Sequence, residues 1–206
     1  MFDQHQKIID QYAKQRPDNM ARVMTFVLAT VQQSLFMVPD IMTEIDKQGA
    51  SSQYLWGWKM QAFDYITDNQ KQIFDETINI FDAYPNPDIA RHELLKYFAM
   101  LPGFGLVKGG FCCQLIFGLS GCLDSHNIKR FGLKASRFSA ARFKNARSET
   151  LRNDIVKEYH GIVDALGGSC ELWNSWCEYV AENAPTRYNS VYEVSRWHLI
   201  GIGLET

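Results

Sequence analysis

The chain lacks an excess of charge of either sign, since its 21 lysines and arginines face 23 aspartates and glutamates. Overall charge therefore gives no indication of a nucleic-acid partner, and such an indication must come from where the charges lie. A long hydrophobic run is also missing. The two most apolar stretches, 23–31 and 111–123, are shorter than the roughly 20 residues of a membrane helix. We expect no membrane partner.

Cysteine is scarce and carries no recognisable pattern. The five cysteines, at 112, 113, 122, 170 and 177, are odd in number and none has a CxxC spacing. Cys170 and Cys177 are spaced like the first half of a cluster-binding loop, but no further cysteine follows. We predict buried thiols in a reducing compartment and no disulfide, metal or cofactor. The polar segment 1–15 is not a secretory signal peptide, so a cytoplasmic, non-secreted protein is expected.

The sequence has no repeat, no low-complexity linker and no alternating apolar and polar run long enough to predict a strand. Helical spacing of apolar residues is found instead in 20–35, 63–81, 89–98, 106–119, 149–166 and 171–184. Pro39 is expected to end the first of these helices. Asp18 or Asn19 is expected to cap that helix, and Asp88 the one at 89–98. The predicted fold class is all-α, and 46% apolar residues suffice for one compact unit or two small lobes.

Residues 101–105, Leu-Pro-Gly-Phe-Gly, form a turn between two predicted helices. Gly103 and Gly105 permit backbone angles that other residues resist, and Phe104 is expected to lie between the two helices. The unpaired amides at the start of the second helix form an anion site suited to a DNA phosphate, with Val107 and Lys108 in its first turn. For the turn taken alone, an ordinary helix–turn–helix corner is the favoured explanation.

Asp124 lies 19 residues after Gly105 and just before a predicted helix over 125–130. By itself, an aspartate there is typical of a helix N-cap. After a phosphate-binding hairpin and one helix, however, it would face the nucleotide whose phosphate is held. A carboxylate there can stabilise the positive charge that builds on a sugar when an N-glycosidic bond breaks, or activate water. His126 is a candidate to hold the carboxylate by a hydrogen bond, or a packing residue.

These segments resemble a known family. The series LPGFG (101–105), an apolar helix ending in FG (117–118), and LDSH (123–126) is similar to the LPGVG, FG and VDTH of helix-hairpin-helix DNA glycosylases of the endonuclease III type. Gln32 and Gln33 match glutamines with which the family approaches a DNA lesion. The resemblance spans about 20–132 and is strongest over 101–126.

The resemblance implies two helical lobes with a DNA-binding cleft between them. One lobe would contain residues 20–120, with the helix-hairpin-helix at about 88–119, and the other would contain 1–19 and 121–206. The implied partner is double-stranded DNA, bound by a monomer, with one nucleotide flipped into the cleft.

Several features depart from the family. Bifunctional members have a Schiff-base lysine at the position of Val107, whereas Lys108 comes one residue later and is rotated by about 100° on a helix. Lys108 is therefore predicted to face phosphate, and water is the expected nucleophile. The four-cysteine iron–sulfur loop is absent. Gly109-Gly110 is unusual at a helix start and indicates either close backbone approach or loose packing.

Eight of the 21 basic residues fall within residues 129–152, with Glu149 as the one acid besides them. We favour a DNA backbone surface here over a merely solvated face, with Lys129, Arg130, Lys134 and Arg137 as its first contacts. Tyr54, Trp56 and Trp58 are candidates for a base pocket or a duplex wedge, although core packing explains them as well.

The leading hypothesis is a monofunctional DNA glycosylase that hydrolyses the N-glycosidic bond of a damaged or modified base. A second is a glycosylase-like enzyme of the phage type that acts on a modified pyrimidine during DNA base hypermodification. A third is a non-catalytic DNA-binding protein in which Asp124 only caps a helix. The target base cannot be predicted from the sequence.

Overall fold

A computed structural model describes residues 2–33 and 37–183, and within these ranges the chain is all-helical, as predicted. The helices are α1 (Phe2–Ala13), α2 (Pro17–Ala29), α3 (Val38–Gln48), α4 (Trp58–Asp68), α5 (Gln70–Ala83), α6 (Pro87–Met100), α7 (Leu106–Phe117), α8 (Ser125–Arg130), α9 (Ala140–Lys144), α10 (Glu149–Ala165) and α11 (Gly168–Asn183). Two short 3-10 helices, η2 (Gly49–Ser51) and η3 (Ala135–Phe138), precede α4 and α9.

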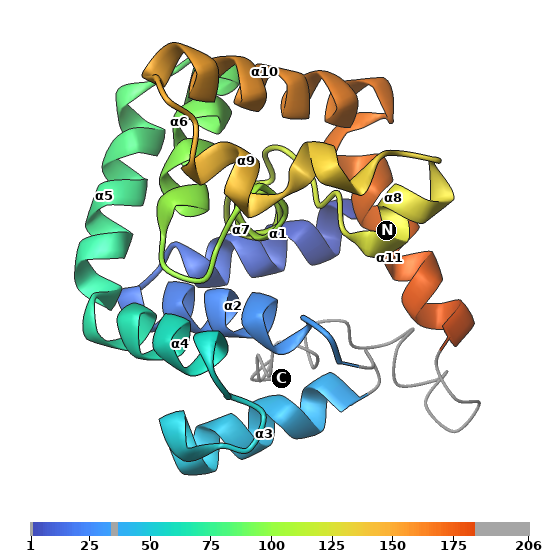
Figure 1. The fold of residues 1–206 in the computed structure, drawn as a ribbon. Coiled ribbons are helices and arrows are strands. Elements are labelled where there is room, and N and C mark those ends of the chain that lie inside the picture. Colours follow the sequence, from blue (N-terminus) through green and yellow to red (C-terminus); the bar gives the residue numbers. More distant parts are fainter. Residues whose placement is uncertain (1, 34–36, 184–206) are drawn as a thin grey trace.

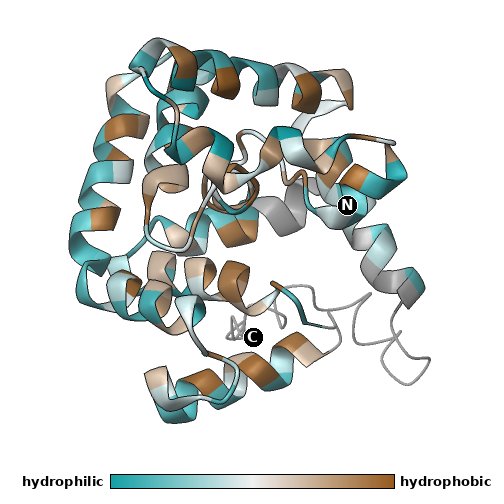
Figure 2. Cartoon of the chain, in the orientation of Figure 1, coloured by the Kyte–Doolittle hydropathy of each residue, from teal (hydrophilic) through white to brown (hydrophobic). Residues whose placement is uncertain are grey.

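Helix α7 lies at the centre, with α1, α2, α6 and α9 packed around it (Figure 1). Its residues from 109 to 117 are all buried, as expected for a helix that is apolar on every side. Figure 2 colours α7 mostly as hydrophobic, whereas the outer helices α5 and α10 alternate between hydrophilic and hydrophobic residues. Burial of α7 by four neighbours therefore organises the core.

Buried apolar side chains from α1 to α11 form one continuous cluster. The division into two lobes, 20–120 and 1–19 with 121–206, stays a prediction. In the described ranges, no helix combines the length and the apolar character that crossing a bilayer requires.

Several boundaries differ from the predicted ones. The apolar stripe over 63–81 is divided between α4 and α5 at Asn69, whose side chain donates a hydrogen bond to the Tyr65 carbonyl (2.8 Å). Pro39, expected to end a helix, lies in the first turn of α3. Amides there have no partner within the helix, so the missing N–H of proline costs no helical hydrogen bond. Helices α1, α3 and α9 were not predicted.

The caps also differ. Asn86, and not Asp88, caps α6, because its side chain accepts from the Asp88 amide (2.9 Å). Helix α2 begins at Pro17, and Asn19 in its first turn is buried and donates to the Tyr12 carbonyl (2.9 Å). Asn19 therefore ties α2 to α1 and caps neither helix start.

Cys112, Cys113 and Cys122 are buried free thiols, as predicted. Cys170 is exposed, so the prediction that all the thiols are buried is wrong at this position. It lies in the first turn of α11, on the side turned to solvent. The side chain of Cys177 lies outside the described part of the chain.

Candidate functional site

The turn between α6 and α7 is closely packed on both sides. Gly103 has φ +74°, which favours glycine, and a Cβ on it would lie 2.5 Å from the Cβ of Ala62 in α4. A Cβ on Gly105 would lie 2.5 Å from the Cβ of Ala140 in α9. Phe104 between them is 2% exposed. The two glycines thus let α4 and α9 close on the turn, and Phe104 fills the space beneath it.

Helix α7 begins immediately after this turn without a side-chain cap. The Gly105 carbonyl accepts the first intrahelical bond, from the Gly109 amide (2.8 Å). The amides of the first three helical residues precede that bond and have no intrahelical partner. They give the start of α7 a positive partial charge.

The Gly109-Gly110 pair allows close approach on two faces of α7. A Cβ on Gly109 would lie 3.0 Å from the Ala99 backbone nitrogen in α6. A Cβ on Gly110 would lie 2.3 Å from the Tyr159 hydroxyl oxygen and 2.6 Å from the Gly121 carbonyl oxygen. Of the two explanations for this pair, close approach fits the structure, and both glycines are buried.

A cavity of about 440 Å³ opens between the start of α7, the end of α2 and the start of α8. This is within the size range of small-molecule sites. It is lined by Val27, Thr30, Val31, Gln32, Gly105, Leu106, Val107, Lys108, Phe111, Cys122, Asp124, Ser125, Phe138, Ala140 and Trp176. We refer to it as the central cavity. Of the predicted site residues, it brings together Gln32, Gly105, Val107, Lys108 and Asp124.

Asp124 caps α8 and also lines the central cavity. Its Oδ1 accepts a hydrogen bond from the Asn127 amide (2.8 Å). Burial raises the pKa of the Asp124 carboxyl, while the Asn127 amide and the charge of His126 act in the opposite direction. Asp124 is the one carboxylate among the described residues that line the cavity. The His126 amide also hydrogen-bonds to this carboxylate.

Lys108 lines the same cavity. Its Nζ lies 4.1 Å from the centroid of the Trp58 ring, a cation–π contact. Burial, together with the charges of Lys144 and Lys59, lowers the pKa of Lys108 to about 8. The ammonium is still mostly protonated at pH 7. The predicted orientation, turned away from the reacting centre, is not evident, because Val107 and Lys108 both line the cavity.

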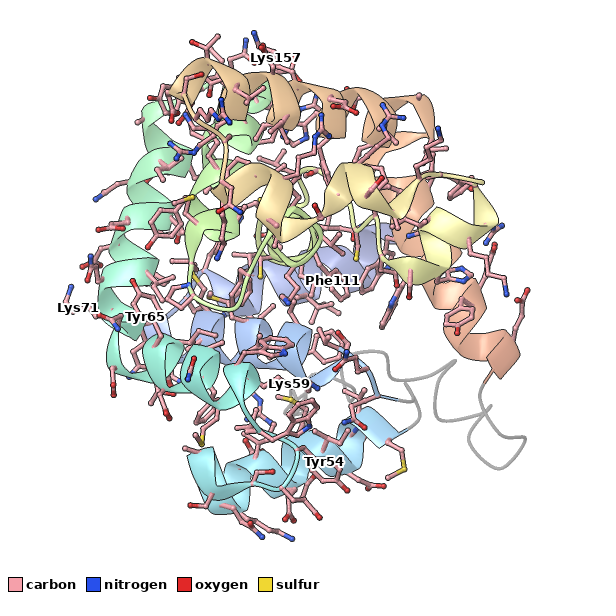
Figure 3. The ribbon with its side chains drawn as sticks, viewed as in Figure 1. Tyr54, Lys59, Tyr65, Lys71, Phe111 and Lys157 are labelled. Atoms are coloured by element: carbon pink, nitrogen blue, oxygen red, sulfur yellow. The ribbon has the colours of Figure 1, made fainter. Side chains whose placement is uncertain are left out.

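Two other lysines near Lys108 also bind neutral groups. Lys59, 1% exposed, donates to the Val31 carbonyl (2.5 Å) beyond the end of α2, and burial lowers its pKa. Lys144 donates to the Leu101 carbonyl (2.8 Å). Figure 3 shows Lys59 inside the molecule, whereas Lys71 and Lys157 extend from its outer edge. Among the described residues, none of these three buried or half-buried lysines has a carboxylate partner.

His126 points away from Asp124 toward α11. Its ring stacks on Tyr179, with centroids 3.8 Å apart, and burial lowers its pKa. Its Nε2 is buried without a hydrogen-bond partner in the described structure. No hydrogen bond from the His126 ring to the Asp124 carboxylate is found in the described structure, where His126 bonds to it only through its backbone amide, and the packing alternative fits the ring.

The predicted lesion-probing residues occupy different environments. Gln32 has φ +57° and lies at the cavity rim, in a backbone conformation that residues other than glycine adopt at a cost. Trp58 lies under Lys108, Tyr54 packs against the core, and Trp56 is 55% exposed. These three aromatic residues and Gln33 are not among the described residues that line the cavity.

Half of the basic residues in 129–152, here the basic segment, are paired with carboxylates. Arg130 pairs with Glu178 (3.1 Å), and Arg152 pairs with Glu149 (3.3 Å). Arg137 and Arg142 share Glu158 of α10, at 2.6 and 2.5 Å. Lys129 and Lys134 are exposed, and within the described ranges they have no ion pair. Four of the basic side chains are thus committed to carboxylates of α10 and α11.

Three aromatic residues that line the cavity were not predicted as site residues. Phe111 comes from the middle of α7, Phe138 from η3 and Trp176 from α11. The rings of Phe111 and Trp176 contact each other, with centroids 5.6 Å apart. Each looks like an ordinary core residue in its own helix, and the contact of α11 with α7 brings Phe111 and Trp176 together.

No family model, no curated protein and no solved structure matches this chain. The class of site therefore follows from its geometry alone. An aromatic wall, one carboxylate, one ammonium and the free amides of a helix start surround one cavity. Such a site can hold a flat ring, attract an anion and stabilise a developing positive charge. In the described part of the chain, no group of three histidines, cysteines or acids is placed to bind a metal ion.

Proposed function

We propose that the chain is a DNA base-processing enzyme that acts as a monofunctional glycosylase on a flipped nucleotide. The observation that carries the proposal is Asp124, a carboxylate with a raised pKa on the wall of an aromatic-lined cavity, beside Lys108 and the start of α7. Perturbed carboxylates in such cavities are frequent in active sites.

In this proposal the base enters between Phe111, Phe138 and Trp176, and a backbone phosphate lies at the amides that begin α7. The bond between the sugar C1′ and the base nitrogen breaks, and its electron pair leaves with the base. The ionised Asp124 opposes the positive charge left on the sugar and orients a water molecule. The water oxygen bonds to C1′, and a water proton ends on the base.

A DNA-binding protein without catalysis is the second candidate. It is favoured by the hydrogen bond from the Asn127 amide to Asp124, because an N-cap explains the aspartate without chemistry. The glycosylase-like enzyme of base hypermodification is a variant of the first proposal, with the same cavity and a base that is altered and retained.

The test is incubation of the protein with duplex DNA carrying a panel of damaged and modified bases, read by mass spectrometry. We expect free base and abasic DNA from at least one substrate. An altered but retained base would support modification instead. Asp124→Asn should reduce the rate by about 100-fold or more, as expected when a charge that stabilises the transition state is lost.

The matched control is Asp40→Asn, which changes an exposed aspartate in the first turn of α3. It should leave the rate and the DNA affinity unchanged. An Asp124→Asn variant that keeps more than about a tenth of the rate would contradict the catalytic role. DNA binding with no product from any substrate would favour the non-catalytic candidate.

A further inference from the structure

The loop from Ser120 to Asp124, here the Asp124 loop, has no regular secondary structure and is nevertheless buried over residues 120–123. Buried backbone polar groups require hydrogen-bond partners. In an ordinary loop, water supplies them. Here side chains of three different helices do so.

The first partner is Tyr159 of α10, which is 1% exposed. Its hydroxyl donates to the Gly121 carbonyl (2.7 Å) and accepts from the Leu123 amide (3.2 Å). One phenol thus binds two peptide groups on either side of Cys122. The absence of a side chain on Gly110 provides the space for this hydroxyl.

The other two partners bind the peptide groups of Cys122. The Cys122 amide donates to Oε1 of Gln114 in α7 (3.1 Å), and the Cys122 carbonyl accepts from Nδ2 of Asn127 in α8 (2.7 Å). Gln114 and Asn127 are both fully buried. Four consecutive polar atoms of the loop backbone are therefore fixed by side chains.

Helix α11 fixes the side-chain amides of Gln114 and Asn127 in turn. Gln114 donates to the Ser169 carbonyl (2.9 Å), and Ser175 donates to Oδ1 of Asn127 (2.8 Å). These bonds also fix which end of each amide faces the loop, because every amide has one donor group and one acceptor oxygen. A buried network with all its members satisfied is rigid.

We propose that Tyr159, Gln114 and Asn127 are positioning residues that hold the Asp124 carboxylate at the wall of the central cavity. None of the three is among the residues that line the cavity, and their side chains act on Asp124 through the backbone of its loop. The Asn127 amide also binds the carboxylate directly. The functional meaning rests on the proposed function, whereas the structural claim concerns the carboxylate alone and is measurable without a substrate.

The experiment follows the pKa of the Asp124 carboxyl by NMR in protein labelled with carboxyl-¹³C aspartate. The Asp124 signal is identified as the one that is absent from the spectrum of Asp124→Asn. Tyr159→Phe should move the pKa of Asp124 downward, because a loosened loop admits water to a carboxyl whose pKa burial now raises. The titratable groups that interact with Asp124 are His126, Cys122 and Tyr159 itself.

If the proposed function also holds, Tyr159→Phe should lower kcat by about tenfold or more while KM changes little, because misplacement of a reacting group acts on the chemical step. The acid limb of the rate profile should shift with the NMR pKa. The matched control is Tyr97→Phe in α6, which removes a hydroxyl bonded to Glu76 outside the cavity and should move neither quantity.

Ser175→Ala provides a milder variant if Tyr159→Phe fails to fold, because it leaves Tyr159 in place and removes the bond from Ser175 to Asn127, together with the surface bond from Arg130 to Ser175. It should give a smaller shift in the same direction. A folded Tyr159→Phe or Ser175→Ala protein with the Asp124 pKa of the wild type would overturn the inference. If the wild-type protein processes no base of the DNA panel while the NMR shifts appear as expected, the proposed function is refuted and the positioning role stands.

Discussion

The central cavity and the basic segment both contain cations, but they use them differently. In the basic segment, Arg137 and Arg142 share Glu158, and Arg130 binds Glu178. At the cavity, Lys108 lies on the Trp58 ring without a carboxylate partner among the described residues. Half of the basic residues in the segment are therefore engaged by carboxylates, whereas Lys129 and Lys134 are exposed and have no ion pair within the described ranges. Counting basic residues along a sequence does not measure the charge that DNA would meet.

The largest expected effect concerns the cavity and pH. Because the pKa of Asp124 is raised above its ordinary value of 3.8, the rate should fall as pH decreases through a value above 3.8, as the carboxylate takes up its proton. Loss of the charge should cost about 100-fold or more in rate. A rate profile without this limb, or with the same limb in Asp124→Asn, would assign the ionisation to another group.

The raised pKa of Asp124 also determines how the stability of the fold changes with pH. The folded protein binds the Asp124 proton more tightly than the unfolded chain, so stability falls as pH rises through the raised pKa. Asn caps helices about as well as Asp. Asp124→Asn should therefore melt at pH 7 no lower than the wild type, measured by differential scanning calorimetry. A clear drop in melting temperature would mean that the Asp124 carboxylate stabilises the fold.

A smaller effect is expected from separate neutralisation of one cation in each region. Lys108→Gln should weaken binding to all DNA sequences alike and reduce the slope of log K against log salt by about 1, as for a phosphate contact. Arg130→Gln should change the slope less, because Arg130 already binds Glu178 and Ser175. Fluorescence anisotropy across a salt series measures both. Equal effects would erase the distinction between the regions.

DNA affinity is expected to rise when arginines of the basic segment lose their carboxylate partner. Glu158→Gln leaves Arg137 and Arg142 without their shared carboxylate, so DNA affinity should rise a few-fold, and more at low salt. Glu171→Gln, which changes an exposed glutamate of α11, is the control for the loss of one negative charge. Affinity that rises equally in both variants would mean that net charge alone matters.

For borohydride trapping at Lys108, no effect is expected. Lys108 has a pKa of about 8 and is mostly protonated at pH 7, so borohydride should trap no covalent adduct with DNA, and product strands should stay intact until alkali or heat is applied. Between pH 8 and 9 the amine becomes neutral, which makes that range the stringent test. A trapped band that grows with pH and disappears in Lys108→Ala would make the enzyme a lyase.

The sequence predicts elements that are marked by local chemistry. The all-helical fold, helix α8 and the capping position of Asp124 follow from apolar spacing and from an aspartate before a helix. Helix α3 was missed because Pro39 indicates a helix end and a helix start equally well. Asn86 was missed as a cap because Asp88 is also a good capping residue, and their order is decided by backbone geometry.

The site is less predictable than the fold, because most of it is assembled between distant segments. Nothing near Trp176 indicates that it meets Phe111, and nothing near Glu158 indicates that it neutralises Arg137 and Arg142. These contacts depend on where α10 and α11 pack. The glycine pair was recognisable as unusual, but its reason is the hydroxyl of Tyr159, about 50 positions later in the chain.

The bonds that hold the Asp124 loop have a consequence for synthesis on the ribosome. Asp124 leaves the exit tunnel well before the residues that fix its loop, because Tyr159 and Ser175 follow it by 35 and 51 positions. A nascent chain can complete α1 to α8 and still have no ordered carboxylate. We therefore expect the carboxylate to become ordered only after α10 and α11 have been synthesised.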